Sequence, residues 1–313
     1  MYKPLWSVTI PTYNAAEYLG ETLESVLNQG INVEKMEIIV VDNCSTDNTA
    51  EIVKSVGGSR IKLFVNDKNL GAYGNFNRCV EVASGEFIHL LNADDLIKPG
   101  FYQRVEEAFA QHPQVHLVCC NADFIDENSV ITGPVPVITC LGQPTNDISE
   151  MLYRNPLLTP TVVVKKNAYE QLGGFDIQFK FVGDWEMWAR VAYNLGAFCI
   201  PDVLAEYRVH SQSTTSNLHA TGADMLDFEK VFARFSQLGY PINEKKKRKR
   251  LSDIAKYYYE LYVVSGNEIG ASNMIGLYKR STSKMDALIL AGKVGLKNFL
   301  NNNLRKADIK VKY

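Results

Sequence analysis

The chain has 313 residues, of which 46% are hydrophobic and 22% charged, and its formal net charge at pH 7 is −2. This composition is ordinary for a globular protein, and the near-neutral balance gives no general attraction to nucleic acid, so we expect no nucleic-acid partner. No run of about 18 apolar residues exists, and the N-terminus lacks the apolar core of a signal peptide, so we expect no spanning helix. The six cysteines show no CxxC spacing, which predicts reduced thiols in a cytoplasmic protein.

The first half of the chain alternates between strand and helix patterns. Continuous apolar, β-branched runs predict strands at 7–10, 36–42, 61–65, 86–91 and 115–124. Amphipathic patterns between them predict helices at 18–29, 49–56, 73–83 and 100–112. This alternation predicts an α/β fold, Rossmann-like, with a mostly parallel sheet flanked by helices.

The rest of the chain changes character twice. The middle is less regular, and its patterns predict a loop at 133–144, a strand at 161–165, a helix at 184–196 and an extended segment at 198–210. After about residue 220 the patterns are helical. We therefore expect a catalytic or binding domain over 1–220 and a helical C-terminal extension over 221–313.

Three polar clusters, PTYN (11–14), DNCSTDN (42–48) and NADD (92–95), fall where predicted strands end. Parallel sheets bind ligands beyond the carboxyl ends of their strands, so this coincidence indicates a site. Residues alone leave alternatives open. Asn14 and Asp47 are also the residue types that begin helices, and Asp42 is equally consistent with a ligand contact and with a structural role.

Asp94 and Asp95 are adjacent carboxylates directly after an apolar strand. Like charges this close repel, and a divalent cation between them would offset the repulsion. Mg²⁺ and Mn²⁺ prefer oxygen ligands of this kind and often share them with phosphate oxygens. The alternative is a solvated turn that precedes the helix at 100–112.

Five stretches in order carry a resemblance to a known family. They are PTYN, VVDNCSTDNT, LLNADDLIKPG, GDWEMWARV (183–191) and EYRVHSQSTT (206–215). Together they resemble family 2 of the inverting nucleotide-sugar glycosyltransferases with the GT-A fold, over roughly residues 5 to 215. The resemblance implies transfer of a sugar from a nucleotide diphosphate, by default uridine diphosphate, to a hydroxyl of a glycan or lipid-linked acceptor. It also implies cell-surface polysaccharide synthesis, with residues 1–125 as the nucleotide-binding half and 126–220 as the acceptor half.

The resemblance implies a role for each matching residue. Asp184 would be the general base. A divalent cation, Mn²⁺ or Mg²⁺, would be held by Asp94, Asp95 and His210. The nucleotide would be contacted by Pro11, Thr12, Tyr13, Asn14, Asp42, Asn77, Arg78 and Asp94. The diphosphate or the acceptor would lie near Trp185, Arg208 and Ser213.

The chain departs from the family pattern at three places. Asn92 stands at the first position of the metal segment, which favours Asp94 as the metal ligand. Gly183 replaces the first of two acidic residues, so Asp184 alone is left as base. The basic residue of the third helix, Arg78, is displaced by one position, or about 100° around a helix, which weakens the case for a phosphate contact.

Other readings compete with the enzyme. A related nucleotidyltransferase would carry a Gly-rich basic loop after the first strand, where this chain reads PTYNAAEYLG. A non-catalytic sugar-nucleotide-binding protein would be expected to lack one of four acids, and this chain has all of them: Asp42, Asp94, Asp95 and Asp184. An NAD-dependent enzyme would need GxGxxG there. Basic residues in EKKKRKR (244–250) and LILAGKVGLKNFLNNNLRK (288–306) allow peripheral binding to the inner face of the cell membrane, with helix packing as the alternative.

Overall fold

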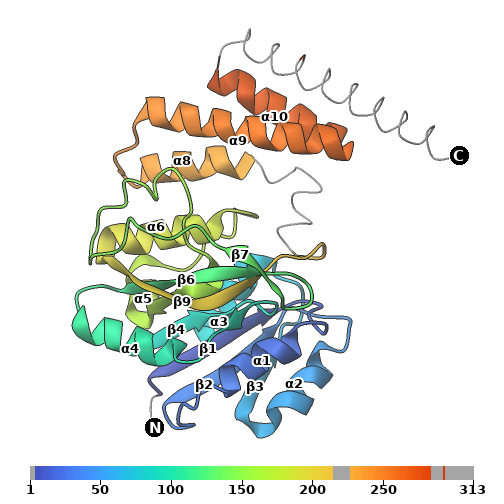
Figure 1. The fold of residues 1–313 in the computed structure, drawn as a ribbon, viewed down its shortest axis with the longest axis vertical. Coiled ribbons are helices and arrows are strands. Elements are labelled where there is room, and N and C mark those ends of the chain that lie inside the picture. The colour runs from blue at the N-terminus through green and yellow to red at the C-terminus, as the bar shows by residue number, and fades with distance from the viewer. Residues whose placement is uncertain (1–3, 214–225, 283–291, 293–313) are drawn as a thin grey trace, which may run out of the picture. The chain divides into compact units, whose positions relative to one another are not determined.

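The computed structural model describes residues 4–213 and 226–282, together with Gly292 (Figure 1). The chain forms two compact units, Met1–His210 and Ser211–Tyr313.

A mixed sheet forms the centre of the first unit. Its order is β3 (Ile61–Val65), β2 (Met36–Asp42), β1 (Trp6–Thr12), β4 (Phe87–Leu90), β8 (Val162–Lys165), β6 (Leu117–Ile125), β9 (Ala197–Arg208) and β5 (Leu96–Ile97), with β7 (Ile131–Pro134) paired to β6. The first four strands are parallel, as the alternating sequence predicts. Beyond β4 the sheet is mixed, because β8 is antiparallel to both β4 and β6.

Helices cover both faces of this sheet (Figure 1). Residues of β1 alternate: Trp6, Val8 and Ile10 enter the apolar core that also contains side chains of α1 (Leu19–Leu27), α2 (Thr49–Gly57) and α4 (Phe101–Gln111). On the other face, α3 (Ala72–Val82), α5 (Lys166–Leu172) and α6 (Gly183–Leu195) meet around the Phe175 ring.

The register of the parallel strands gathers the polar clusters at one edge. Thr12 pairs with Asp42, and Asp42 pairs with Val65, so β1, β2 and β3 end together. Thr9 pairs with Leu90, which places the NADD cluster beyond the same edge. The sheet therefore brings the sequence-predicted clusters together at the carboxyl ends of its strands.

Some elements escape the sequence analysis. The two-residue strand β5 and the seven-residue helix α5 are too short to show a period. The predicted loop at 133–144 begins inside β7, whose pairing with β6 comes from tertiary contact rather than from its own Pro/Gly-rich sequence.

The second unit is helical where the structure describes it. It contains α8 (Asp227–Gln237), α9 (Glu244–Ser265) and α10 (Glu268–Ser281). Asn243 caps α9, its side-chain oxygen accepting from the amide of Lys246 at 3.0 Å. The backbone of Gly270 lies against the Tyr262 ring, where a Cβ would come within 2.7 Å of a ring carbon, so α10 packs closely on α9. The predicted helical extension is confirmed, while the predicted segment at 288–306 lies outside the described residues except for Gly292.

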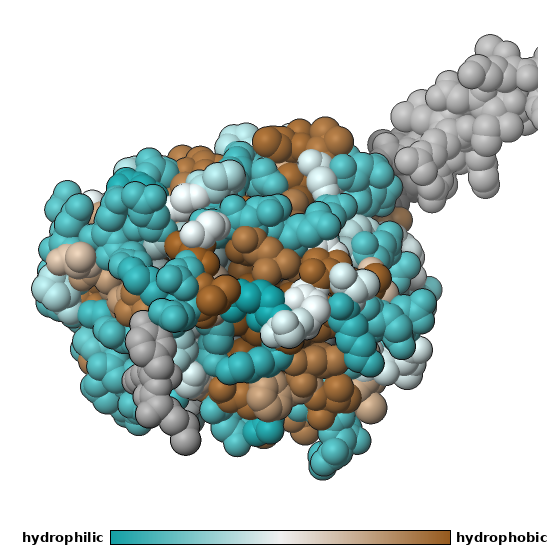
Figure 2. Space-filling view, turned by 90° about the horizontal axis from the view of Figure 1, so that it is seen from below, coloured by the Kyte–Doolittle hydropathy of each residue, from teal (hydrophilic) through white to brown (hydrophobic). Residues whose placement is uncertain are grey.

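No helix among the described residues has the length and apolar character needed to cross a bilayer. Seen from below, hydrophobic residues form separate patches among hydrophilic ones (Figure 2). Scattered apolar surface of this kind is usual and carries no functional argument.

Candidate active site

The loops after β1 and β2 are tied to each other. Asn14, at φ 50°, accepts a hydrogen bond from the amide of Thr46 at 2.8 Å, and its own amide donates to Ser45 Oγ at 2.8 Å. The Asn14 side chain therefore holds the two loops together. This contact favours a structural part for Asn14 alongside its predicted nucleotide contact.

Asp42 ends β2 and is buried at the sheet edge. Its Oδ1 accepts from the amide of Ser45 at 3.1 Å and from the Ser45 hydroxyl at 2.5 Å. Among the described residues Oδ2 accepts no hydrogen bond, so it is available to a ligand. Pro11 and Thr12 lie on the neighbouring strand β1, and the Tyr13 ring that follows is 52% exposed, so these residues border the same space.

An asparagine network that the sequence analysis missed supports this edge. The Asn75 amide on α3 donates to the backbone oxygen of Val41 at 3.0 Å and accepts from Asn66 at 2.9 Å. Asn66 also donates to Asn43 at 3.1 Å. Buried amides that satisfy one another fix the ends of β2 and β3 against α3.

The acidic doublet is split between interior and surface. Asp95 is 1% exposed, and its two oxygens accept from the amide of Arg208 at 2.9 Å and from the Asn92 side chain at 2.8 Å. Burial, followed by the neighbouring Asp94 charge, holds the pKa of Asp95 well above its usual range. Asp94 is 28% exposed, and its Oδ2 lies 2.9 Å from His210 Nε2. The two carboxylates therefore have different surroundings: Asp95 faces the interior, and Asp94 is partly exposed beside His210.

Arg208 does not have the phosphate-facing position that the sequence analysis gave it. Its guanidinium is fully buried and donates to the backbone oxygens of Asp94 at 2.8 Å and Asp126 at 3.1 Å, and to Glu21 Oε2 at 2.8 Å. It also lies 4.6 Å from the centre of the Tyr18 ring. These contacts make Arg208 a structural link between β9, the segment after β4 and α1.

Asp94 and His210 fit a cation site with two protein ligands. The residues that the structure describes include no cluster of three or more Asp, Glu, His or Cys side chains able to hold a metal. This corrects the three-ligand set, because both oxygens of Asp95 are engaged elsewhere. A carboxylate is a ligand type that suits Mn²⁺ or Mg²⁺, and an imidazole is a common ligand of divalent transition metals. The Tyr18 ring packs 4.7 Å from the His210 ring and fixes its position.

Asp184 lies at the start of α6 and is partly exposed. Its Oδ1 accepts from the amide of Trp185 at 2.7 Å and lies 3.4 Å from the Tyr73 hydroxyl, and its Oδ2 accepts from the Asn155 amide at 3.1 Å. Burial outweighs these hydrogen bonds and raises the pKa of Asp184 to about 6. The carboxylate is therefore ionised at neutral pH yet basic enough to accept a proton.

Trp185 is in the core and offers no face for a sugar. Its side chain is 2% exposed, and the indole N–H donates to the backbone oxygen of Met151 at 2.5 Å. The predicted position near the acceptor is therefore wrong for its ring. Trp188, on the same helix, is also buried and packs edge-on against Phe175.

Two predicted residues of α3 point elsewhere. The Asn77 side chain accepts from the amide of Phe175 at 2.7 Å and donates to its oxygen at 2.9 Å, which anchors the loop after α5. Arg78 pairs with Glu81 at 2.7 Å on the exposed side of the helix. Both lie more than a turn beyond the start of α3, away from the carboxyl edge. Ser213 lies in the span of the second unit, and its predicted role stays a prediction.

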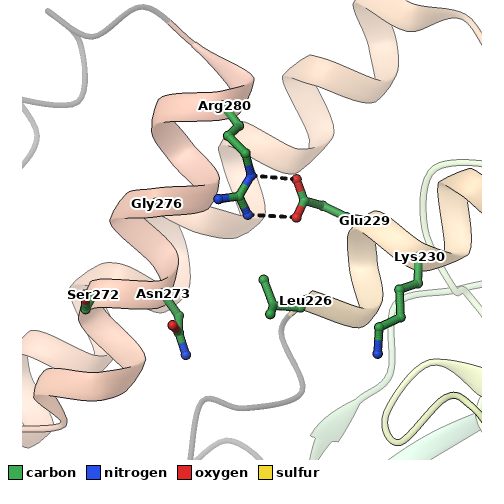
Figure 3. Close-up of a pocket in the computed structure, with 7 residues that line it drawn as sticks. All are labelled: Leu226, Glu229, Lys230, Ser272, Asn273, Gly276 and Arg280. Carbon is green, nitrogen blue, oxygen red and sulfur yellow. Dashed lines mark hydrogen bonds and ion pairs between the residues drawn. The ribbon is translucent and has the colours of Figure 1, made fainter.

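A pocket of about 430 Å³ lies within the helical unit (Figure 3). It lies between α8 and α10, and Glu229 and Arg280 form an ion pair at 2.7 Å across it. Glu229, the acidic residue among the described lining residues, is therefore paired with Arg280. Its lining consists of Leu226, Glu229, Lys230, Ser272, Asn273, Gly276 and Arg280.

Comparisons with known proteins agree with this architecture. Residues 7–161 match the sequence model of glycosyl transferase family 2. A relative from Methanocaldococcus jannaschii, named an uncharacterized glycosyltransferase, is 30% identical over 214 residues, which span 67% of this chain and 72% of that protein. Among solved structures, S. aureus TarS 1–349 in complex with UDP-GlcNAc is similar with a TM-score of 0.59 at 18% identity, covering 89% of this chain and 93% of that one.

A mannosyltransferase from Pyrobaculum calidifontis, solved with GDP-Man and Mn²⁺, has a TM-score of 0.57 at 19% identity, covering 96% of this chain and 88% of that one. At these identities the solved structures establish the GT-A fold alone. The sequence relatives establish more: the chain belongs to glycosyl transferase family 2 and is a glycosyltransferase. Membership sets aside the nucleotidyltransferase and the non-catalytic binding protein.

Proposed function

We propose that the enzyme is an inverting, metal-dependent glycosyltransferase that moves a sugar from a uridine diphosphate donor to a hydroxyl of a glycan or lipid-linked acceptor. One observation carries the proposal: the sheet unit holds a carboxylate with a raised pKa and, separately, a carboxylate–imidazole pair. The first is Asp184, at the start of α6. The pair is Asp94, after β4, and His210, after β9. Surface polysaccharide as the product stays a prediction from the family resemblance.

The proposed chemistry divides between these groups. Asp184 accepts the proton of the incoming hydroxyl as its oxygen attacks the anomeric carbon, on the face opposite the leaving diphosphate. Inversion follows from that single displacement. A general base in this position contributes roughly 10²–10⁴-fold to the rate.

The leaving group needs charge stabilisation on its own side. Asp94 and His210 would hold a Mn²⁺ or Mg²⁺ ion, which neutralises charge on the diphosphate. Asp42 would accept a hydrogen bond from the nucleoside through Oδ2, while Ser45 keeps its Oδ1 in place. Thr12 and Tyr13 would border the base. The Mn²⁺ and nucleotide sugar in the Pyrobaculum structure, and UDP-GlcNAc in TarS, support a donor and cation of this kind.

A thermal-shift panel tests the donor and the cation together. We expect UDP with Mn²⁺ to raise Tm, because a ligand at a hundred times its Kd stabilises by about 2.7 kcal/mol. GDP, ADP and CDP should shift Tm less, and chelation of the metal should abolish most of the effect. The same panel on Asp42→Asn should lose the preference for uridine. An equal response to all nucleotides, with or without metal, would contradict the proposed donor.

A second element of the proposal concerns the helical unit. Residues 211–313 contain 18 Lys and Arg against 9 Asp and Glu, although the whole chain is nearly neutral. The first two turns of α9 carry EKKKRKR, and most of these side chains are exposed. Cations at a helix N-terminus oppose the helix dipole, so this run lowers the stability of α9 by itself. We propose that it binds an anionic lipid surface at the inner face of the membrane.

Vesicle sedimentation tests this surface. We expect the full chain to sediment with vesicles that contain phosphatidylserine and to stay in solution with neutral ones, with binding weakened by salt. Lys245→Gln/Arg248→Gln/Lys249→Gln should reduce binding roughly tenfold or more, since each cation contributes about 1 kcal/mol. Lys35→Gln/Lys54→Gln/Lys68→Gln removes three exposed cations from the first unit and serves as the matched control. Equal losses in both variants would contradict a specific basic face.

A further inference from the structure

The segment before Asp184 is held by a residue that is 110 positions away in sequence. The Tyr73 hydroxyl, from the first turn of α3, accepts from the amide of Gly183 at 2.9 Å and donates to the backbone oxygen of Phe181 at 2.8 Å. It lies 3.4 Å from Asp184 Oδ1. One hydroxyl thus fixes the backbone on which the carboxylate is mounted and reaches the carboxylate itself.

The Tyr73 ring also fills the space beside position 183. A Cβ added to Gly183 would lie 2.7, 2.8 and 2.9 Å from three carbons of that ring. Real Cβ atoms do not approach other atoms so closely, so any side chain at 183 requires the ring to move. The ring cannot move easily, because it stacks on Phe175 at 5.9 Å and meets Phe76 edge-on at 5.7 Å.

We propose that Tyr73 is a positioning residue for Asp184, and that position 183 is glycine because the Tyr73 side chain occupies the place of the missing acidic side chain. This inference rests on the proposed role of Asp184 as base. The family pattern that this chain resembles has two acidic residues here, and the chain has Gly183 and Asp184. The polar atom next to the base is supplied by a phenol from α3 in place of a second carboxylate.

The replacement changes the electrostatics of the base. A second carboxylate would repel the charge on Asp184. The Tyr73 hydroxyl instead shares its proton between the Phe181 oxygen at 2.8 Å and, more weakly, Asp184 Oδ1 at 3.4 Å, which favours the ionised carboxylate and lowers its pKa. In the described part of the chain, the groups bonded to the Asp184 carboxylate are the Tyr73 hydroxyl, the Asn155 amide and the Trp185 backbone amide. Loss of the Tyr73 contact should therefore raise the pKa of Asp184 further.

Tyr73→Phe removes the hydroxyl and keeps the ring. We expect kcat for transfer to fall roughly tenfold with the donor KM unchanged, because a shift of about 1 Å in a reacting group costs up to 10²-fold. The acidic limb of the pH–rate profile should move to higher pH, since the contact that favours the ionised carboxylate is lost.

Tyr102→Phe is the matched control. Tyr102 is fully buried on α4 and its hydroxyl bonds His89 Nδ1 at 3.1 Å, remote from Asp184 in the fold. It should lower Tm and leave the pH profile unchanged. If Tyr73→Phe behaves in the same way, Tyr73 is merely structural and the inference is overturned. Turnover retained in Asp184→Asn would instead overturn the base assignment.

A double-mutant cycle tests the pairing of Tyr73 with Gly183. Gly183→Ala should lower Tm by several degrees in the natural background, because its Cβ meets the Tyr73 ring. The same substitution in a Tyr73→Ala background should cost little, since the space is then open. Residues in contact give non-additive effects, so additive losses would overturn the pairing.

Discussion

Asp184→Asn is expected to bind donor normally and to lose transfer by roughly 10²–10⁴-fold, the contribution of a general base. The amide is isosteric with the carboxylate and keeps an oxygen for the Trp185 amide, so the start of α6 should stay in place. Single-turnover transfer, with donor affinity measured separately by calorimetry, distinguishes the chemical step from binding.

The pH dependence gives an independent check on the same residue. The pKa of Asp184 is raised to about 6, so this carboxyl, the proposed base, becomes protonated as the pH falls through that value. We expect kcat/KM to fall about tenfold for each pH unit below the pKa. The residual activity of Asp184→Asn should not show this acidic limb of the pH–rate profile.

Folding stability should respond in the opposite direction. A carboxyl whose pKa is higher in the folded chain than in the unfolded chain stabilises the fold at low pH, and this contribution is lost as the pH rises through about 6. Removing the charge therefore should not lower Tm at neutral pH. Asp176→Asn, in the loop that leads to α6, makes the same substitution where the carboxylate bonds the Gln178 amide. It should retain transfer, and a comparable loss there would contradict a specific role for Asp184.

Asp94→Asn is expected to reduce metal-dependent transfer by roughly 10²–10³-fold while leaving the fold intact. The side chain is partly exposed, and among the described residues its side-chain hydrogen bond is with His210, so little stability depends on it. Manganese binding, followed by electron paramagnetic resonance, should weaken in parallel with the loss of rate.

Asp95→Asn provides the contrast within the same doublet. Its oxygens accept from the Arg208 amide and from Asn92, so an amide at this position would place a donor against a donor. Leaving a buried donor unsatisfied costs about 1–3 kcal/mol, which should lower Tm. Manganese affinity should change little. If Asp95→Asn lost the metal and Asp94→Asn kept it, the assignment within the doublet would be reversed.

Local patterns in the sequence were sufficient for most of the fold. The strands at 36–42 and 61–65 have the predicted bounds, because continuous β-branched runs leave little choice. The edge of the sheet that carries the site also followed from sequence, since parallel strands end on one side. The antiparallel pairing of β8 with β4 and β6 could not be predicted, because the sequence of a four-residue strand does not indicate which strands it will pair with.

Side-chain direction within the site was the harder part. Asp94 and Asp95 are the same residue type in adjacent positions. The inward one, Asp95, is distinguished by its contacts with the nearby Asn92 side chain and with the amide of Arg208, which is 113 residues away. Trp185 was misplaced because its burial depends on a loop carbonyl at Met151. Tyr73 and Asn155 were missed because their partner, Asp184, is far from both in sequence. The available signal in the sequence was Gly183, which stands where the family pattern has an acidic residue.

Arg208 and His210 are two residues apart in one short motif, yet Arg208 has a structural role and His210 is a proposed metal ligand. The Arg208 guanidinium donates hydrogen bonds to Glu21, to the backbone oxygen of Asp94 after β4 and to the backbone oxygen of Asp126. These bonds fix the position of the end of β9. Because His210 follows two residues later, the same hydrogen bonds also determine where its imidazole lies. We therefore expect a substitution at Arg208 to reduce activity by displacing His210. A screen that measured activity alone would then wrongly assign Arg208 a direct part in the reaction.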